Sequence, residues 1–383
     1  MDIVVDKSQC YGCYACISVC PQSCIIVKED SCGYIYPVID QEKCINCNLC
    51  KKSCPSINLN IPMSIPHKAY AVWSLDSHTR DKSSSGGFAT EASRYFIYNK
   101  GVVYAASIIS DLQVRHTRIT SEAGIEKAQG SKYVHSYIGD SYSQCRQDLK
   151  QGKKVLFIGT PCQISGLKKY LREEFENLIT IDLVCHGVPP QKMLKDALSS
   201  LTDTKKISSF SCRKGTRFIL TAYNGKREYR SRFSYDRYMR AFLDGINYRE
   251  KCYDCQFAQN FRVSDLTIGD FWGLTSLEKG NIDESKGINV VLINTKKGSD
   301  FFELMKPKLF YEEKDVEEAV SGNSQLKSPS VKDNRRKIFL EGYEKSGNFI
   351  KEVDKIYDIT TSKKIRMFFK NLSEKFKSNI KSK

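Results

Sequence analysis

Two cysteine runs with the same spacing constrain the fold of this 383-residue chain more than any other feature. Cys10, Cys13, Cys16 and Cys20 are followed by Pro21, and Cys44, Cys47, Cys50 and Cys54 are followed by Pro55. In each run, three thiolates with short spacers can surround one face of a cube of iron and sulfide. The fourth, set apart by a longer spacer and a proline turn, points elsewhere. The repeat predicts a compact internal duplication built around iron and sulfide.

The spacing resembles that of bacterial two-cluster ferredoxins, in which the fourth cysteine of each run ligates the other cluster. The resemblance implies one 4Fe-4S cluster on Cys10, Cys13, Cys16 and Cys54, and a second on Cys44, Cys47, Cys50 and Cys20. Zinc is the alternative, because paired cysteines with this spacing also bind zinc. A structural zinc ion needs only four ligands and not two interlocked runs of four, so the iron–sulfur interpretation is favoured.

Composition limits the compartment and the partners. The chain has 16 cysteines, but it is long, and residues 1–9 lack the apolar core of a signal peptide. We therefore expect reduced thiols and a cytoplasmic protein. No apolar run approaches the roughly 18 residues that span a bilayer. The formal net charge of +16 favours an acidic partner or an anionic membrane surface. Nucleic acid is disfavoured, because no DNA-binding or RNA-binding signature accompanies the charge.

We expect three parts in a mixed α/β (α+β) chain. The first is a two-cluster ferredoxin domain over 1–62, which ends where Pro62 and Pro66 mark a short polar linker. The second is a larger α/β domain over 67–357. The third, over 358–383, is a basic amphipathic helix, because apolar residues recur at helical spacing on one side and lysines on the other. It predicts contact with an anionic membrane at the inner face, or else docking on the chain's own domain.

In the larger domain, predicted strands alternate with predicted helices. The strands are expected at 68–74, 101–107, 113–119, 155–158, 178–184 and 288–293, and the helices at 88–98, 121–128, 140–151, 161–172 and 191–201. Such alternation is typical of a largely parallel sheet, and ligands collect at the carboxyl ends of its strands. Asn224-Gly225 predicts a hairpin turn farther along the chain.

Three strand-end or helix-start segments carry candidate chemistry. Ser85-Gly86-Gly87 precedes a predicted helix and suits an anionic group, although a loop with Ser85 as helix cap is the alternative. Lys132 could contact a cofactor, or it could be one more solvated lysine. His186 follows a predicted strand directly, so a proton-transfer role is weighed against a hydrogen bond to backbone.

Taken together and in this order, the motifs resemble the beta subunits of coenzyme F420 hydrogenases and dehydrogenases, in the bacterial form with an N-terminal two-cluster ferredoxin domain. The motifs are Ser84-Ser85-Gly86-Gly87, Gly130-Ser131-Lys132-Tyr133, Gly159-Thr160-Pro161-Cys162-Gln163, Cys185-His186-Gly187, Cys252-x2-Cys255 and Gly269-Asp270-Phe271-Trp272-Gly273. The resemblance implies an iron–sulfur flavoprotein that binds FAD. It implies a flavin site that includes Ser85, Gly86, Gly87, Lys132, Thr160, Gln163 and Asp270.

A third 4Fe-4S cluster is expected in the larger domain. Cys162 and Cys185 each follow a predicted core strand, and Cys252 and Cys255 have a spacing that lets neighbouring thiolates share one cluster. The family resemblance agrees, because its shorter members also bind one cluster. Cys212 is the alternative fourth ligand. The remaining thiols fit no set and are interpreted as buried or incidental; they are Cys24, Cys32 and Cys145.

These features predict an oxidoreductase that passes electrons between ferredoxin, or another small electron carrier, and an organic substrate through 4Fe-4S clusters and FAD. Similar proteins occur beside enzymes of surface-polysaccharide synthesis, which implies work in that process. The alternative is a non-catalytic electron-transfer subunit that serves a partner enzyme. A cluster-based sensor would need a DNA-binding module, and none is visible.

Overall fold

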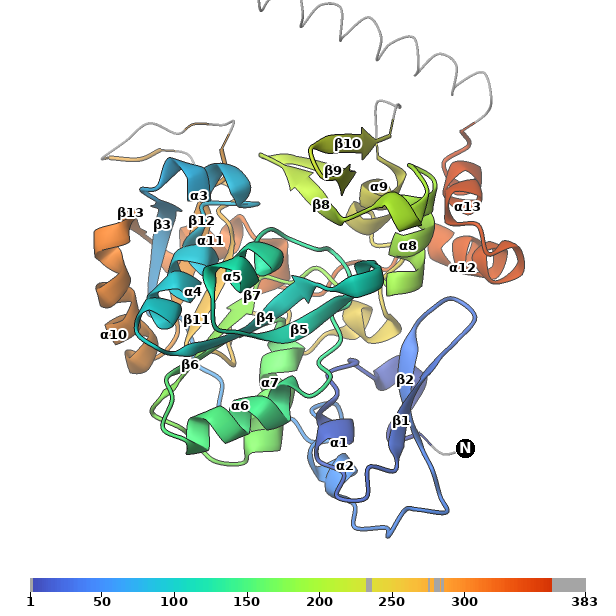
Figure 1. The fold of residues 1–383 in the computed structure, drawn as a ribbon, viewed down its shortest axis with the longest axis horizontal. Coiled ribbons are helices and arrows are strands. Elements are labelled where there is room, and N and C mark those ends of the chain that lie inside the picture. Colours follow the sequence, from blue (N-terminus) through green and yellow to red (C-terminus); the bar gives the residue numbers. More distant parts are fainter. Residues whose placement is uncertain (1–2, 232–235, 275, 279–282, 284–285, 360–383) are drawn as a thin grey trace, which may run out of the picture.

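The computed structural model describes residues 3–231, 236–274, 276–278, 283 and 286–359 (Figure 1). The amphipathic helix predicted over 358–383 lies almost wholly outside the described residues, so it stays a prediction, as does the division into three domains. Among the helices that the structure describes, none is long and apolar enough to cross a membrane.

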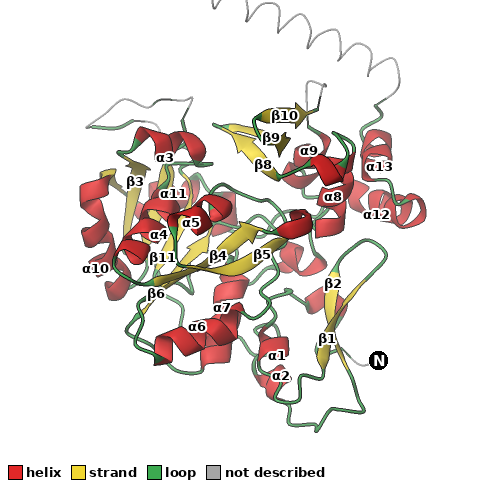
Figure 2. Ribbon diagram, in the orientation of Figure 1, coloured by secondary structure: helices red, strands yellow, loops and turns green. Residues whose placement is uncertain are grey.

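An eight-stranded mixed sheet organises the larger part of the chain (Figure 2). In sheet order its strands are β13 (Leu309–Lys314), β3 (Lys68–Ser74), β12 (Asn289–Ile293), β11 (Leu266–Asp270), β7 (Leu178–Leu183), β6 (Val155–Gly159), β4 (Val102–Ile108) and β5 (Val114–Ile119). β11, β7, β6 and β4 run parallel to one another, whereas the pairs β11–β12, β12–β3, β3–β13 and β4–β5 are antiparallel. The predicted mixed α/β fold with a parallel core is confirmed.

Helices cover both faces of this sheet, because its central strands bury side chains on both sides. Every residue of β6 and β12 is buried. One face packs against α4 (Phe88–Tyr98), α5 (Glu122–Ala128) and α10 (Lys296–Met305). The other packs against α6 (Ser141–Lys150), α7 (Pro161–Leu171) and α11 (Val316–Ser321). The short helix α3 (Ser77–Lys82) follows β3.

A second, smaller layer lies beside the large sheet. It contains the three-stranded sheet β8 (Ser209–Lys214), β9 (Arg217–Asn224) and β10 (Arg227–Arg230), with helices α8 (Gln191–Ser199), α9 (Arg237–Leu243), α12 (Arg335–Ser346) and α13 (Phe349–Ile356). Gly225 adopts a positive φ of 57°, as the predicted hairpin turn requires. The sequence did not predict α12, because it buries only Phe339 and Tyr343 deeply among its many charged residues.

The N-terminal part repeats one local structure around each cysteine run. The runs lead into short helices, α1 (Ala15–Ser18) and α2 (Leu49–Lys52). Tyr14 and Asn48 occupy the same place in the two runs, and both adopt left-handed backbone with φ near 60° (65° and 57°). Between the runs, β1 (Ile25–Glu29) and β2 (Ile35–Ile39) form an antiparallel pair. Figure 1 shows α1 beside α7, which anchors this part on the larger sheet.

Candidate functional site

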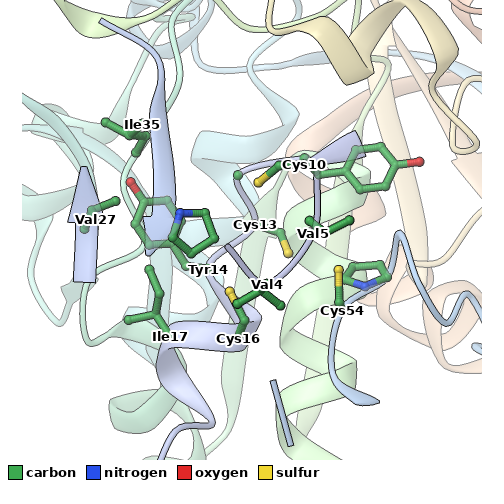
Figure 3. Close-up of a pocket in the computed structure, with 14 residues that line it drawn as sticks. Val4, Val5, Cys10, Cys13, Tyr14, Cys16, Ile17, Val27, Ile35 and Cys54 are labelled. Atoms are coloured by element: carbon green, nitrogen blue, oxygen red, sulfur yellow. The ribbon is translucent and has the colours of Figure 1, made fainter. Parts of the chain in front are cut away.

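The four cysteines predicted for the first cluster line one cavity in the N-terminal part (Figure 3). They are Cys10, Cys13, Cys16 and Cys54, and all four are buried. The remaining walls of the cavity are largely apolar, with Val4, Ile17 and Ile35 among them. Burial raises the pKa of Cys13 and Cys16 well above the usual thiol value. Four sulfurs in apolar surroundings match the donor set of a 4Fe-4S cluster.

The second predicted group lines a separate cavity; its members are Cys20, Cys44, Cys47 and Cys50. Cys47 is exposed, whereas the other three are partly buried. Cys24 also lines this cavity, and its Sγ lies 3.3 Å from the Sγ of Cys20. The structure therefore brings together the two crossed groups that the sequence predicts, and it places Cys24 beside the second of them.

Zinc is the alternative to an iron–sulfur cube for these cysteines. Within the described part of the chain, no three His, Cys, Asp or Glu side chains are grouped tightly enough to bind a single metal ion. A zinc ion holds each thiolate about 2.3 Å from its centre. A cube of four irons and four sulfides needs four thiolates, and each of the two cavities is lined by four predicted ligands.

The third predicted group assembles at the carboxyl ends of neighbouring strands. Cys162 lies in the first turn of α7, directly after β6, and Cys185 follows β7. Cys252 lies in a 3-10 helix, Glu250–Asp254, and Cys255 ends it. Burial, and then the thiols of Cys252, Cys162 and Cys255, raise the pKa of Cys185 well above its usual value. Burial and the neighbouring thiols likewise raise the pKa of Cys162 to about 12. The four cysteines therefore share one neighbourhood.

The other free thiols lie elsewhere. Cys212 is fully buried in β8, where burial and Asp236 raise its pKa and Lys132 opposes them. This environment differs from that of the third group, to which Cys212 was the alternative ligand. Cys145 is buried under the large sheet, and Cys32 is buried with its Sγ 3.8 Å from the carbonyl oxygen of Leu340.

The three groups follow one another in a row. Burial raises the pKa of Cys54 in the first group, and the thiols of Cys10 and of Cys50, from the second group, add to the effect. At the other side of the first group, burial raises the pKa of Cys13, and the thiol of Cys162 from the third group adds to the effect. The row therefore runs from the second group, where a cysteine is exposed, through the first group to the third at the edge of the sheet.

Helix α7 makes the contact between the first and third groups. Tyr142 Oη lies 2.9 Å from the carbonyl oxygen of Cys13 and 2.7 Å from that of Gln163. A β-carbon added at Gly166 would lie 3.2 Å from both the Cβ and the carbonyl oxygen of Cys13. Neither Tyr142 nor Gly166 is identifiable from the sequence, because both contact Cys13, which is far away in the chain.

A buried ion pair supports the third group. Arg262 Nη2 donates to Asp182 Oδ1 over 2.9 Å, and both side chains are at most 1% exposed. Asp182 lies in β7 shortly before Cys185, and Arg262 also donates to the carbonyl oxygen of Phe257 over 3.0 Å. The pair therefore connects the strand that leads to Cys185 with the loop that follows Cys255. Neither residue was predicted as part of a site, and no spacing pattern marks them.

Two segments predicted for the flavin lie side by side. Ser84 Oγ accepts a hydrogen bond from the backbone N–H of Ser131 over 2.7 Å, which joins Ser84-Ser85-Gly86-Gly87 to the loop of Lys132. In the described structure Ser85 Oγ is buried without a hydrogen-bond partner. A β-carbon at Gly86 would lie only 2.2 Å from the carbonyl oxygen of Val72, so the chain needs glycine there. An unpaired hydroxyl beside close-packed glycines before α4 fits a polar cofactor group.

Lys132 is buried and donates to the carbonyl oxygens of Ala128, Gln129 and Gly130, the last two over 3.1 and 3.0 Å. Burial lowers the pKa of Lys132 to about 7, and the nearby thiol of Cys212 opposes the shift. The Lys132 amine is therefore held in place by the loop and is not solvated.

The other predicted cofactor residues differ in their availability. Thr160 and Gln163 form a capping box at the start of α7, and Gln163 also donates to the carbonyl oxygen of Ser136 over 2.9 Å. The side chain of Gln163 is thus used for hydrogen bonds within the protein. Asp270 accepts a hydrogen bond from Arg213 over 2.9 Å at the end of β11. His186 is partly buried, and burial lowers its pKa while Asp270 opposes the shift.

Comparison with known proteins found two family models, a relative and a solved structure that match parts of this chain. Residues 152–319 match the family described as the C terminus of the coenzyme F420 hydrogenase/dehydrogenase beta subunit, and residues 36–103 match the 4Fe-4S dicluster domain. An uncharacterised protein of Methanocaldococcus jannaschii is 25% identical over 371 residues, which cover 86% of this chain and 96% of that protein. A chain of the F420-reducing NiFe hydrogenase complex from Methanosarcina barkeri has a TM-score of 0.48 and 17% identity, covering 77% of this chain and 91% of that one. The family resemblance expected from the sequence is confirmed.

Proposed function

We propose, on the premise that this chain is an iron–sulfur redox protein related to the beta subunits of coenzyme F420 hydrogenases and dehydrogenases, that it is a ferredoxin-linked flavin oxidoreductase. The row of three cysteine groups, which begins at exposed Cys47 and ends at the strand edge, carries the proposal. Its substrate is an organic molecule. Work in surface-polysaccharide synthesis is expected from the resemblance alone.

Each iron–sulfur cluster and the flavin would be held by residues described above. The first two cysteine groups would each bind a 4Fe-4S cluster, and the third group would bind another. Ser85, Gly86 and Gly87 would hold part of FAD, with Lys132 beside them. When bound, the clusters supply one-electron transfer and the flavin couples it to two-electron chemistry on an organic molecule. The protein's contribution is to hold these groups close together and to bury all four cysteines of the first group.

Proton transfer at the substrate would fall to side chains at the strand edge. His186 follows β7 and Asp270 ends β11, and the two interact electrostatically. A half-buried imidazole whose pKa lies below its usual value is neutral near pH 7, so it can accept a proton. Asp270 is held by Arg213 and orients this end of the site. We therefore assign His186 as the proton carrier.

The exposed end of the row suits an acidic electron carrier. Cys47 and Ile45 are exposed there, Ile45 by 60%. Lys51 and Lys52, also exposed, lie at the end of α2 between Cys50 and Cys54. An apolar spot with lysines beside it complements the acidic surface of a small carrier such as ferredoxin. Contact between the C-terminal tail and an anionic membrane remains a separate proposal from sequence.

The test uses the full chain, purified without oxygen. We expect about twelve irons per chain for three cubes of four, equal acid-labile sulfide, and a yellow flavin released on denaturation. Iron without sulfide, or a fully metallated chain that carries no flavin and gains none on incubation, would contradict the proposal.

Electron entry can be tested separately. Lys51→Glu with Lys52→Glu should slow reduction by ferredoxin but not by dithionite, which needs no docking. Lys205→Glu with Lys206→Glu is the matched control, since it reverses an equally exposed lysine pair in another part of the chain. Equal rates for the two double variants would contradict the assigned entry point.

The second candidate function is a non-catalytic electron-transfer subunit, which the family description as a beta subunit favours. The two functions differ in what the isolated chain does. An oxidoreductase consumes reduced ferredoxin by itself when its substrate is present. Consumption that begins only after a partner enzyme is added supports the accessory subunit.

A further inference from the structure

Arg249 is the largest fully buried side chain of the described structure that carries a permanent charge, with 1% of its surface exposed. Its guanidinium group donates to the carbonyl oxygen of Cys10 over 3.3 Å and to that of Ile35. It also lies 4.8 Å from the centre of the Tyr36 ring. The charged end of the side chain therefore lies against the loop that carries the first cysteine group.

The backbone of the same residue belongs to the third group. The N–H of Cys252 donates to the carbonyl oxygen of Arg249 over 3.0 Å, and the N–H of Arg249 donates to the carbonyl oxygen of Val188 over 3.0 Å. At the other end, a β-carbon added at Gly12 would lie 3.1 Å from Arg249 Cζ. Arg249 thus starts in the turn of one cysteine group and ends in the loop of another.

The charge of Arg249 has no carboxylate partner within the described residues, although other buried arginines have one. Arg262 pairs with Asp182, and Arg237 pairs with Asp354. The ionisable groups that interact most with Arg249 are Cys10, Tyr36, Cys252 and Tyr14. A buried charge needs a compensating charge nearby. Thiolates are the available source, because cysteines that bind metal are deprotonated.

We infer that Arg249 is a fixed positive charge shared by the first and third cysteine groups, and that it raises the reduction potential of the iron–sulfur clusters bound there. Reduction adds negative charge to a cluster, and a buried cation nearby stabilises the reduced form. Water does not screen the effect, since the guanidinium is buried. The first group feels the charge more strongly, because the guanidinium group contacts its loop. The inference rests on the proposed function.

The experiment compares wild type, Arg249→Met and Arg249→Lys as full chains purified without oxygen. Iron and sulfide are counted first, and the midpoint potentials are then measured by redox titration with electron paramagnetic resonance. In Arg249→Met the potential of the first cluster should become more negative, that of the third should shift less, and that of the second should stay nearly unchanged. Arg249→Lys keeps the charge and should remain close to wild type. Arg237→Met with Asp354→Asn removes a buried arginine elsewhere and should shift none of them.

The outcomes separate this inference from the proposed function. A fully metallated Arg249→Met with wild-type potentials overturns the role of Arg249 and leaves the proposed function intact. The same negative shift in Arg249→Lys also overturns it, because the charge is then not the cause. Wild-type protein without iron and sulfide contradicts both. If Arg249→Met loses iron, Arg249→Gln replaces it in the comparison, since the amide can still donate to the carbonyl oxygen of Cys10 without a charge.

Discussion

The first two cysteine groups and the third present the same number of sulfurs, but they are built by opposite means. The first two draw every member from residues 10–54 and depend on local turns, such as the left-handed residues Tyr14 and Asn48. The third collects its members from residues 162–255 and depends on the order of β6 and β7 in the sheet. One kind of site is encoded by spacing, and the other is encoded by topology.

The difference predicts that the two kinds of site fail separately. Damage to the sheet should disturb the third group and spare the first two, because their turns are local. Two experiments test this separation, and a third tests the contribution of a buried histidine to stability.

The largest expected effect is the loss of one whole cluster. Cys252→Ser with Cys255→Ser removes two sulfurs of the third group, so about four irons per chain should be lost while about eight remain. Cys212→Ser is the matched control, since Cys212 is also a buried thiol of the larger part but lies apart from the group. Iron and sulfide analysis measures both variants. If only Cys212→Ser loses iron, Cys212 is a ligand of the third cluster, and Cys252 and Cys255 are not.

A smaller effect is expected from the buried ion pair behind the third group. Asp182→Asn leaves Arg262 buried without its counter-charge, which should lower the free energy of unfolding by about 3–5 kcal/mol. Asp300→Asn is the control, because it breaks a pair with Lys296 whose side chains are 60% and 85% exposed. Its cost should stay below about 1 kcal/mol.

Urea unfolding followed by tryptophan fluorescence measures this difference, because Trp73 and Trp272 both lie in the larger part of the chain. The ferredoxin-type irons should remain bound in Asp182→Asn under native conditions. If those irons are lost together with the third cluster, the two kinds of site are not independent.

The smallest expected effect is a dependence on pH. His116 is buried between Ser136 and the carbonyl oxygen of Ile158, and burial lowers its pKa to about 4. Below pH 6.5 the unfolded chain binds a proton at this position that the folded chain does not bind until about pH 4. His116 should therefore contribute about 3 kcal/mol to the stability that is lost as the pH drops through that window.

The measurement is urea unfolding at several pH values, again by tryptophan fluorescence. His116→Gln cannot take up the proton, so its stability should depend less on pH between 6.5 and 4 than that of wild type. Equal slopes for the two proteins would show that His116 does not titrate as its burial requires.

Local patterns predicted most of the fold. The strand expected at 68–74 and the helix expected at 88–98 match β3 and α4, because a continuous apolar run and a glycine pair define them. β13 and the helices α12 and α13 were not predicted, since their apolar positions are sparse or the segment is short. Thr160-x-x-Gln163 is a capping-box pattern. That pattern could have indicated the structural use of Gln163.

The residues that join the groups could not be predicted in this way. Arg249 lies three positions before Cys252, but its guanidinium contacts Cys10, which is 239 residues away in the chain. Tyr142 contacts the carbonyl oxygen of Cys13 across a separation of 129 residues. No periodicity or spacing reports contacts of this range, because they follow from the packing of α7 and the Cys252 turn against the N-terminal loop.

Gly166 allows helix α7 of the larger part to pack closely against Cys13 of the N-terminal part. A glycine inside a helix costs about 0.5–1 kcal/mol compared with alanine. Helix α7 bears that cost where an added methyl group would lie 2.9 Å from Tyr142 Oη and 3.2 Å from Cys13. Electron tunnelling weakens exponentially with distance, so a spacer even slightly thicker would slow exchange across it. In the proposed electron path, the absence of a methyl group at Gly166 would therefore keep the distance between the first and third clusters short.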